Sequence, residues 1–475
     1  MTMSSLKTKV KYALRRRLWW IKALQEEREK KKYLAELRSA PRTTSSASKN
    51  VFLLSVDSLG AKHLGCYGYS RSVSPNLDLV SKRGVLFDRV ITQASWTKPA
   101  LASIHTSLFP SVHKADSAGE AGDRVGVQSA NILSDRFCTL AECFRQGGYG
   151  TAGFTDGGYA HSFFGFGRGF EHYDNAAGGL KSCLSRALRW VLHHRDKPFF
   201  VYIHCWDAHF PYTDRPPYNR RFIDKRAGIV LDSRTRSEIN KGQRKLSPRE
   251  MEFLRGMYDG CINLVDDQIP FLLNELERLG VADKTILAVT GDHGEAFGEH
   301  GILEHTECIY NEVLRVPLIL CGPDLPAGTR ISSQARSIDI MPTLLDLCGR
   351  MSPPNIEGVS LVPWIKGQRQ DHLVAVTETE RRGGQVAIQD GRYKLIQKKG
   401  EGGIELYDLV SDPNENTDIS KTQPQLLSMM EEALASWEYQ MEKLRQDYWS
   451  GGDKAESNEV SPEVLERLQN LGYIE

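Results

Sequence analysis

Residues 51–57 read VFLLSVD, a mostly apolar run that ends at Asp57. Two later runs follow the same pattern: PFFVYIHCWDAH at residues 198–209 and TILAVTGDHGE at residues 285–295. Because these runs lack the alternation of a strand with one solvated face, they predict strands that are buried on both faces. Each run ends in acidic or imidazole side chains, so the strand ends predict a polar site.

A helical pattern separates the second run from the third. Residues 247–280 begin with Ser247 as N-cap, Pro248 at the first helical position and Glu250 where a capping box needs it, and Gly280 closes the pattern. Alternating strands and helices predict an α/β fold. We expect a large, doubly wound, mostly parallel sheet with helices on both of its faces.

Ligands bind beyond the carboxyl ends of the strands in such a sheet. The residues expected at that edge are Asp57, Asp207, His209, Asp292 and His293. Carboxylates and imidazoles that converge either bind a cation or repel one another, so we expect Asp57, Asp292 and His293 to hold a divalent metal ion. The imidazole favours Zn²⁺ or Mn²⁺, while the oxygen ligands leave Ca²⁺ and Mg²⁺ open.

The segment SWTKPALASIHTSLFPSVH, residues 95–113, carries Thr97 two residues before Pro99. A bound cation stabilises an alkoxide, so Thr97 is a candidate for both metal ligand and nucleophile. Without such contact a threonine hydroxyl is a weak nucleophile. The alternative interpretation of Thr97 is a helix N-cap, a position that threonine favours when a helix follows.

The composition is ordinary for a soluble enzyme, with 475 residues, 40% hydrophobic and 25% charged residues, and a net charge of +1. A charge this small argues against a molecule that binds nucleic acid through its overall field. The nine cysteines include no Cys-x-x-Cys pair. That pattern favours reduced thiols and a cytoplasmic location.

Residues 1–42 are strongly basic, with thirteen Lys and Arg against four Glu. Apolar residues recur there at helical spacing, which predicts a basic amphipathic helix. Such a helix indicates peripheral contact with the anionic inner membrane surface, or packing against the protein's own body. No apolar run reaches the length of a signal-peptide core or a membrane span, so we expect neither.

Three segments together resemble the sulfatases of the alkaline phosphatase superfamily: NVFLLSVDSLGAKHLGCYGY at residues 50–69, the Thr97 segment, and TGDHGEAFGEHG at residues 290–301. The resemblance extends over about residues 50–415. It implies that Asp57, Asp292 and His293 bind the metal and that residue 97 carries a covalent intermediate. It also implies a smaller C-terminal domain.

The expected organisation has three parts. Residues 1–49 form the basic helix and a linker, and residues 50–370 form the catalytic α/β domain. Residues 371–475 form a C-terminal subdomain with a small antiparallel sheet and terminal helices. A polar, basic insertion at residues 213–245 is expected beside the site, as a lid or a clamp for an anionic substrate.

The departures from the family pattern bear on the substrate. Sulfatases carry Cys or Ser at the nucleophile and oxidise it to formylglycine, whereas oxidation of Thr97 would give a ketone, so no formylglycine is expected. Ala100 and Leu101 stand where the family has Ser and Arg, and Lys98 is the candidate to replace the missing charge. Ser58 replaces a second aspartate, which argues against Ca²⁺. Together these changes favour a phosphate-type ester over a sulfate ester.

Two histidines complete the predicted site. His209 matches a family histidine that contacts the substrate or the leaving group, and His305 stands where many members have another basic residue. With Asp207 they could form a second metal site, although a substrate clamp or a general acid is the alternative role. Glu295 and neighbouring polar residues are interpreted as solvated loop residues.

The prediction is therefore a hydrolase for a phosphomonoester, phosphodiester or phosphonate, with a small-molecule, glycan or lipid ester as substrate. The alternatives are a sulfatase that works without formylglycine, a transferase that moves a phosphoryl-linked head group onto a glycan or lipid, and a non-catalytic binding protein on the same scaffold. No nucleic-acid partner is expected, and the sequence leaves the oligomeric state open.

Overall fold

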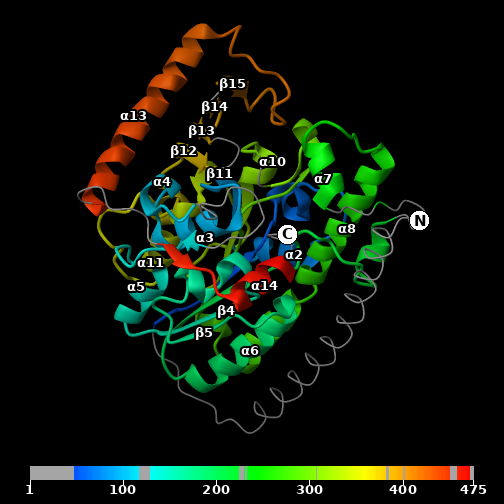
Figure 1. The fold of residues 1–475 in the computed structure, drawn as a ribbon. Helices are drawn as coiled ribbons and strands as arrows, with labels where there is room; N and C mark the ends of the chain where they lie inside the picture. The colour runs from blue at the N-terminus through cyan, green and yellow to red at the C-terminus, as the bar shows by residue number, and fades with distance from the viewer. Residues whose placement is uncertain are drawn as a thin grey trace.

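A computed structural model gives the arrangement of the chain (Figure 1). The structure describes residues 48–116, 129–223, 229, 233–305, 308–380, 384–399, 402–449 and 457–470. The predicted basic helix of residues 1–42 lies outside the described residues. Among the residues that are described, no helix is both long and apolar enough to cross a bilayer.

The body of the molecule is an eight-stranded sheet in the order β11-β2-β10-β7-β1-β6-β4-β5. Its strands are β1 (Asn50–Val56), β2 (Val85–Ile91), β4 (Gly150–Thr155), β5 (His172–Asp174), β6 (Phe199–Cys205), β7 (Thr285–Gly291), β10 (Arg315–Cys321) and β11 (Thr329–Arg336). All neighbours pair in parallel except β10, which runs antiparallel to both β2 and β7. The predicted large, mostly parallel sheet is confirmed.

The three runs that predicted the sheet lie side by side at its centre as β1, β6 and β7. Every residue of these strands is buried. Their core residues divide between the two faces: Val51 and Leu53 belong to one hydrophobic cluster, while Phe52 and Leu54 belong to another. Two buried faces explain why the sequence of β1 shows no polar alternation.

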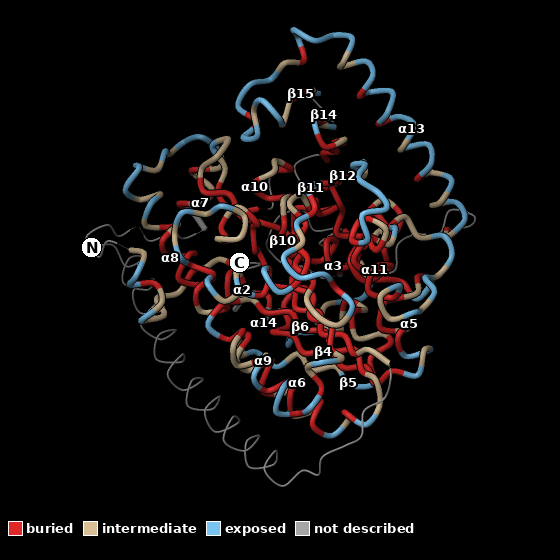
Figure 2. The backbone as a smooth tube through the Cα atoms, turned by 180° about the vertical axis from the view of Figure 1, so that it is seen from behind, coloured by how far each residue is buried: buried red, intermediate tan, exposed pale blue. Residues whose placement is uncertain are grey.

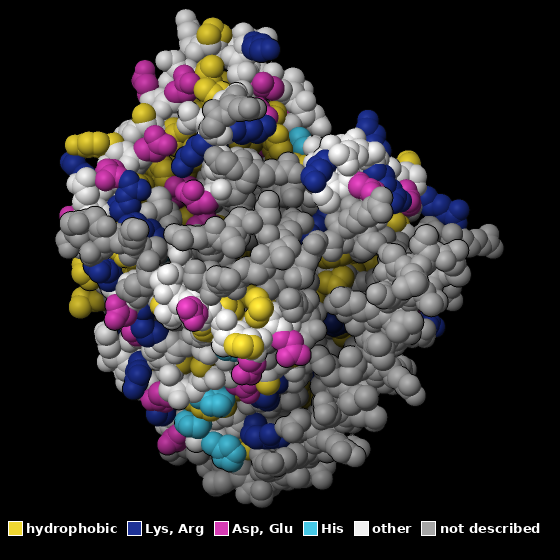
Figure 3. All heavy atoms as spheres, in the orientation of Figure 1, with side chains coloured by type: hydrophobic (Ala, Val, Ile, Leu, Met, Phe, Trp, Pro, Cys, Tyr) yellow, Lys and Arg dark blue, Asp and Glu magenta, His cyan; other side chains and the backbone are white. Residues whose placement is uncertain are grey.

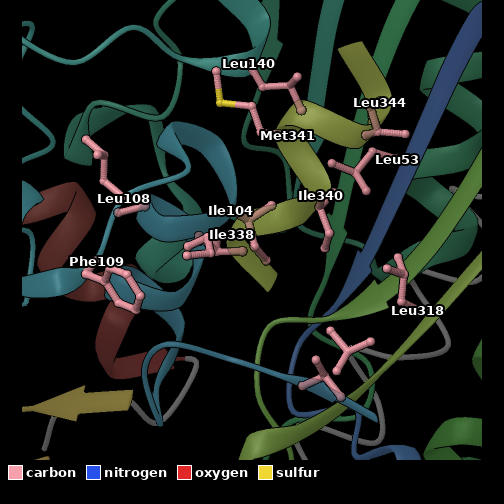
Figure 4. Packing of buried hydrophobic residues seen from close by; sticks show 14 of the residues in the cluster. Leu53, Ile104, Leu108, Phe109, Leu140, Leu318, Ile338, Ile340, Met341 and Leu344 are labelled. Atoms are coloured by element: carbon pink, nitrogen blue, oxygen red, sulfur yellow. The ribbon is translucent and has the colours of Figure 1, made fainter. Parts of the chain in front are cut away.

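Helices cover both faces, as predicted (Figure 1). The larger ones are α2 (Pro75–Lys82), α3 (Thr97–Thr106), α5 (Leu140–Gln146), α6 (Gly179–His194), α7 (Ser233–Asn240), α8 (Pro248–Asp266), α9 (Ile269–Arg278), α11 (Ile340–Leu347), α13 (Pro424–Tyr448) and α14 (Pro462–Asn470), and single turns form α4 (Pro110–His113), α10 (Asn311–Leu314) and α12 (Val362–Ile365). Figure 4 shows Ile104 of α3 and Ile340 of α11 packed among the residues on one side of the sheet, and Figure 2 shows the buried strands at the centre of the molecule.

The single helix predicted over residues 247–280 is two helices. The predicted start is confirmed, because Ser247 and Glu250 form a complete capping box at α8. The helix nevertheless ends at Asp266, and α9 begins at Ile269 with a proline in its first turn. Pro270 has no N–H to donate and its ring clashes with the carbonyl four residues earlier, so a helix cannot run through it unbroken.

A second sheet has four antiparallel strands: β12 (Ala375–Thr379), β13 (Gln385–Gln389), β14 (Tyr393–Lys398) and β15 (Gly403–Asp408). The predicted small antiparallel sheet is therefore confirmed. The long helix α13 follows it and is largely exposed along its outer side (Figure 2). The domain limits proposed from sequence, at residues 49 and 370, remain predictions.

The end of the described chain returns to the large domain. β16 (Ser457–Glu459) pairs antiparallel with β3 (Ser129–Asn131), and Val464 and Leu468 of α14 belong to the same buried cluster as Val51 of β1. Two further short strands, β8 (Ala296–Phe297) and β9 (Leu303–Glu304), form a hairpin. Figure 3 shows acidic and basic side chains interspersed on the face that it presents, which agrees with the small net charge.

A buried ion pair connects the small sheet to the large domain. Lys394 Nζ of β14 lies 2.6 Å from Glu415 Oε1, and both side chains are fully buried. Glu415 Oε2 accepts a hydrogen bond from the backbone N–H of Asn311 at 2.7 Å, and Lys394 donates to the Asn311 side chain at 3.2 Å. Asn311 begins α10, so this cluster fixes the small sheet against the segment that precedes β10.

We predict that Lys394→Met destabilises the protein by about 3 kcal/mol or more, because Glu415 is left buried without its cation. Urea unfolding followed by circular dichroism measures this. The double variant Lys394→Met/Glu415→Gln removes both charges and is expected to recover much of the loss. A single variant as stable as the wild type would show that the pair does not hold the two parts together.

Candidate active site

The site begins where two neighbouring parallel strands end. Val56, the last residue of β1, is in register with Gly291, the last residue of β7. The next residues are therefore Asp57 and Asp292, which emerge at the same edge of the sheet with His293 beside them. This is the convergence that the strand ends predicted.

These three residues form a compact group of possible metal ligands. Each offers one ligand atom, and the atoms all lie within 4.8 Å of one another. His293 Nε2 is 3.5 Å from Asp57 Oδ1 and 3.5 Å from Asp292 Oδ2. All three side chains are fully buried. Two carboxylates and an imidazole form a donor set that suits a divalent ion.

The hydrogen bonds around this group leave ligand atoms available for a cation. Asp292 Oδ1 accepts from the backbone N–H groups of Ser58 at 3.1 Å and His293 at 2.9 Å. Asp292 Oδ2 is buried and has no hydrogen-bond partner among the described residues. An orphaned buried carboxylate oxygen is costly, and a bound cation would satisfy it. The residues therefore fit a divalent metal ion.

The tautomer of His293 also suits a metal ligand. Its Nδ1 lies 3.0 Å from the carbonyl oxygen of Gly294, a distance at which an Nδ1–H group donates to that oxygen. The proton on Nδ1 leaves the lone pair on Nε2, the atom that faces Asp57 and Asp292. Metal-binding histidines are commonly oriented by such a bond at the other ring nitrogen.

The two carboxylates have opposite electrostatic environments. Burial and the nearby charge of Asp57 raise the pKa of Asp292 well above its ordinary value. Burial alone would also raise the pKa of Asp57, but His209, His204 and His293 hold it below its usual range. Two acids this close cannot both carry full charge at low cost without a positive partner.

Thr97 is the first residue of α3, and its side chain is directed at this group. Thr97 Oγ1 lies 3.4 Å from Asp57 Oδ2 and 3.3 Å from His293 Nε2, and the residue is only 1% exposed. The N-cap position is occupied by Trp96, so the alternative interpretation of Thr97 as the helix cap is wrong. The start of α3 also favours a negative charge beside Thr97.

Two predicted histidines lie beside the metal-ligand group. The His305 ring is centred 4.1 Å from the ring of His293 and 5.1 Å from the ring of His209. His209 follows β6, while His293 and His305 follow β7 and β9, so two regions distant in sequence bring these imidazoles together. Burial lowers the pKa of His209 to about 4.

The predicted second metal site is not assembled. Asp207 Oδ2 accepts a hydrogen bond from the backbone N–H of Leu180 at 2.6 Å, near the start of α6, and Asp207 Oδ1 pairs with Arg215. Its carboxylate is thus engaged away from His209 and His305. Within the described residues, the group around Asp57 is the one cluster of three or more potential metal ligands.

Lys98 is fully buried next to Thr97, but its ammonium group has a different neighbour. Lys98 Nζ donates to the carbonyl oxygen of Asn131 in β3 at 3.0 Å, and it lies 5.5 Å from the ring centres of Trp96 and Phe164. The charge that was expected to replace the missing arginine is therefore directed at β3.

Two residues that the sequence placed outside the site belong to its surroundings. His204 is not among the residues predicted for the site, yet its Nε2 lies 3.5 Å from Asp57 Oδ2 and its Nδ1 lies 3.1 Å from Ser55 Oγ. Glu295 was interpreted as solvated, yet it is fully buried and its Oε1 lies 3.3 Å from Nδ1 of His305. The position of His204 at the end of the β6 run, next to β1, was the available signal.

Comparisons with known proteins agree with this geometry. A family model described as Sulfatase matches residues 49–350, and one described as N-sulphoglucosamine sulphohydrolase, C-terminal, matches residues 298–446. The chain is 25% identical over 420 residues to a protein named Sulfatase from Formosa agariphila, covering 77% of this chain and 82% of that protein.

Other similar proteins include a second sulfatase and a solved structure of a phosphonate monoester hydrolase. A protein named Delta 4,5-hexuronate-2-O-sulfatase from Bacteroides thetaiotaomicron is 22% identical over 447 residues, which is 84% of this chain and 90% of that protein. The crystal structure of a phosphonate monoester hydrolase of Agrobacterium radiobacter has a TM-score of 0.67 at 20% identity, covering 87% of this chain and 100% of that one. This structural likeness shows the fold.

The chain belongs to the sulfatase family, whose model covers well over half of it. It is an ester hydrolase of the alkaline phosphatase superfamily.

We predict that Asp292→Asn lowers the metal content of the purified protein together with its activity, because a neutral amide oxygen binds a divalent ion more weakly than a carboxylate does. Mass spectrometry of the metals in the dialysed protein measures the occupancy. Glu299→Gln is the matched control, since it removes an acid from the same loop that pairs with Lys62 instead. Metal occupancy equal to that of the wild type would contradict the ligand role of Asp292.

Proposed function

We propose that this protein is a divalent-metal-dependent hydrolase that cleaves a phosphate-type ester through a covalent intermediate on Thr97. The observation that carries the proposal is the position of Thr97 Oγ1, which lies within 3.4 Å of both Asp57 and His293. The ester classes are phosphomonoesters, phosphodiesters and phosphonates. A sulfate ester is the second candidate.

A divalent ion held by Asp57, Asp292 and His293 would favour the anionic form of the Thr97 hydroxyl and neutralise charge on the ester oxygens. Thr97 Oγ1 then forms a bond to the phosphorus as the bond to the leaving-group oxygen breaks. Water subsequently cleaves the Thr97 ester, which restores the hydroxyl and releases the acid product.

The two histidines supply the remaining roles. The His305 ring lies 5.1 Å from the ring of His209 and 4.1 Å from the ring of His293, measured between ring centres. We propose that His209 binds the ester as a neutral imidazole, and that His305 lies on the leaving-group side and gives a proton to the leaving-group oxygen. Both rings are buried, which keeps water away from the reacting atoms until the leaving group departs.

The surroundings of Asp57 and Asp292 support Zn²⁺ or Mn²⁺ over Ca²⁺ or Mg²⁺. An imidazole is part of the donor set, and imidazole favours the transition ions. Ser58, which replaces a family aspartate, donates its hydroxyl to Asp57 Oδ1 at 3.2 Å. It thus orients a carboxylate and adds no negative charge, so the site lacks the all-oxygen, strongly anionic shell that calcium prefers.

The side chain at position 97 supports an unmodified nucleophile. Formylglycine requires an aldehyde, and oxidation of a threonine side chain gives a ketone. We therefore propose that Thr97 acts as the hydroxyl itself.

The missing family arginine, replaced by the buried Leu101, supports a substrate other than a typical sulfate ester. The sulfate candidate is favoured by the names of the similar curated proteins, which include Sulfatase and Delta 4,5-hexuronate-2-O-sulfatase.

We further propose that the enzyme works in the cytoplasm, where the cysteines stay reduced. All nine cysteines are free thiols in the structure. Peripheral attachment to the inner membrane surface through residues 1–42 is a proposal that rests on the sequence of that segment alone.

We predict that Thr97→Ala lowers turnover by about 1,000-fold or more, because no other hydroxyl replaces the nucleophile. Thr97→Ser is the matched control, and it should retain measurable activity through its hydroxyl. Initial rates with a fluorogenic ester measure the loss, and circular dichroism checks the fold. Turnover by Thr97→Ala at a rate near that of the wild type would exclude the nucleophile role.

The substrate class is tested by parallel assays of aryl phosphate, aryl phosphodiester, aryl phosphonate and aryl sulfate with Zn²⁺, Mn²⁺, Mg²⁺ or Ca²⁺ added. We predict the highest kcat/KM for a phosphate-type ester with Zn²⁺ or Mn²⁺. Turnover of the sulfate alone would show that the phosphoester assignment is wrong while leaving the nucleophile test intact.

A further inference from the structure

The insertion at residues 213–245 makes a specific contact with the hairpin that carries His305. The described part of this insertion includes α7. Asn240, the last residue of α7, donates its side-chain Nδ2 to the carbonyl oxygen of Leu303 at 3.2 Å. Its Oδ1 accepts from the backbone N–H of Leu303 at 2.8 Å. One amide side chain therefore satisfies both main-chain groups of Leu303, as a neighbouring strand would.

A second contact lies one turn away on the same helix. Arg236 Nη1 donates to Glu304 Oε2 at 2.6 Å, and both side chains are largely buried. Leu303 and Glu304 are the whole of β9. α7 thus holds each residue of this short strand, one through its backbone and the other through its side chain.

β9 is a weak element by itself, so its position depends on contacts from outside the hairpin. Glu304 has φ of 67°, in the left-handed region that non-glycine residues rarely adopt. Among the residues that the structure describes, β9 pairs only with the two residues of β8. A two-residue hairpin with a strained residue is marginal by itself, so the contacts from α7 decide where the next residue lies.

The next residue is His305. Its ring is packed against His293 and His209, and its Nδ1 lies beside the buried Glu295. We propose that α7 is a positioning element for the reaction: Asn240 and Arg236 fix β9 and so hold the imidazole of His305 at the leaving-group side of the site. The insertion is therefore a brace for a site residue, where the sequence suggested a lid or a clamp.

This role predicts a selective defect. A phenyl ester has a poor leaving group and depends on the proton donor, whereas a 4-nitrophenyl ester departs with little help. Asn240→Ala should lower kcat/KM for the phenyl ester about tenfold more than for the 4-nitrophenyl ester. His305→Gln should show the same selectivity, and Arg236→Gln tests the second contact.

Lys241→Ala is the matched control, because Lys241 is the exposed residue next to Asn240 and should show no change in the ratio. A helix that only stabilises the fold would give equal losses for the two esters in Asn240→Ala and Arg236→Gln. That result would overturn the proposal.

The leaving-group assay rests on the proposed function, so a second measurement avoids activity altogether. NMR of protein labelled at the ring carbons of its 13 histidines reports each imidazole, and the His305 signal is assigned by its loss in His305→Gln. Asn240→Ala should shift or broaden this signal, and Lys241→Ala should leave it unchanged. An unaltered His305 signal in Asn240→Ala would refute the brace even if the enzyme turned over none of the esters.

Discussion

The repulsion between two buried carboxylates is the constraint on which the site depends. Asp57 and Asp292 emerge from adjacent parallel strands in register, so the sheet forces them together at one edge. Both are fully buried, and Asp292 keeps one oxygen without a hydrogen-bond partner among the described residues. A cation between them relieves this cost, and the same cation would activate the Thr97 hydroxyl that α3 brings to within hydrogen-bonding reach.

The sheet and its metal-ligand group could be predicted from sequence for a physical reason. A strand buried on both faces must be continuously apolar, so β1, β6 and β7 are visible as runs, and parallel pairing brings their ends to one edge. This rule alone is enough to predict that Asp57, Asp292 and His293 lie close together. The division of the predicted helix at Pro270 was also within reach, because the missing N–H of proline is a local property.

The remaining features depend on long-range packing that no local pattern reveals. Asp207 ends a buried strand as Asp57 does, but the N–H of Leu180 and Arg215 take its carboxylate away from the histidines. Glu295 has the sequence context of a solvated loop residue, yet it is fully buried beside His305. Likewise, Lys98 is adjacent to Thr97 in sequence, while its ammonium group reaches β3.

The central claim is that one metal ion joins the two strand ends to the Thr97 oxygen. Anomalous diffraction from crystals soaked in Mn²⁺ or Zn²⁺ tests it most directly. The account predicts a single strong peak about 2.0–2.3 Å from oxygens of Asp57 and Asp292 and from Nε2 of His293, with Thr97 Oγ1 in contact. A structure in which no ion occupies this position at saturating metal, or in which the ion binds with Thr97 turned away, would contradict the account.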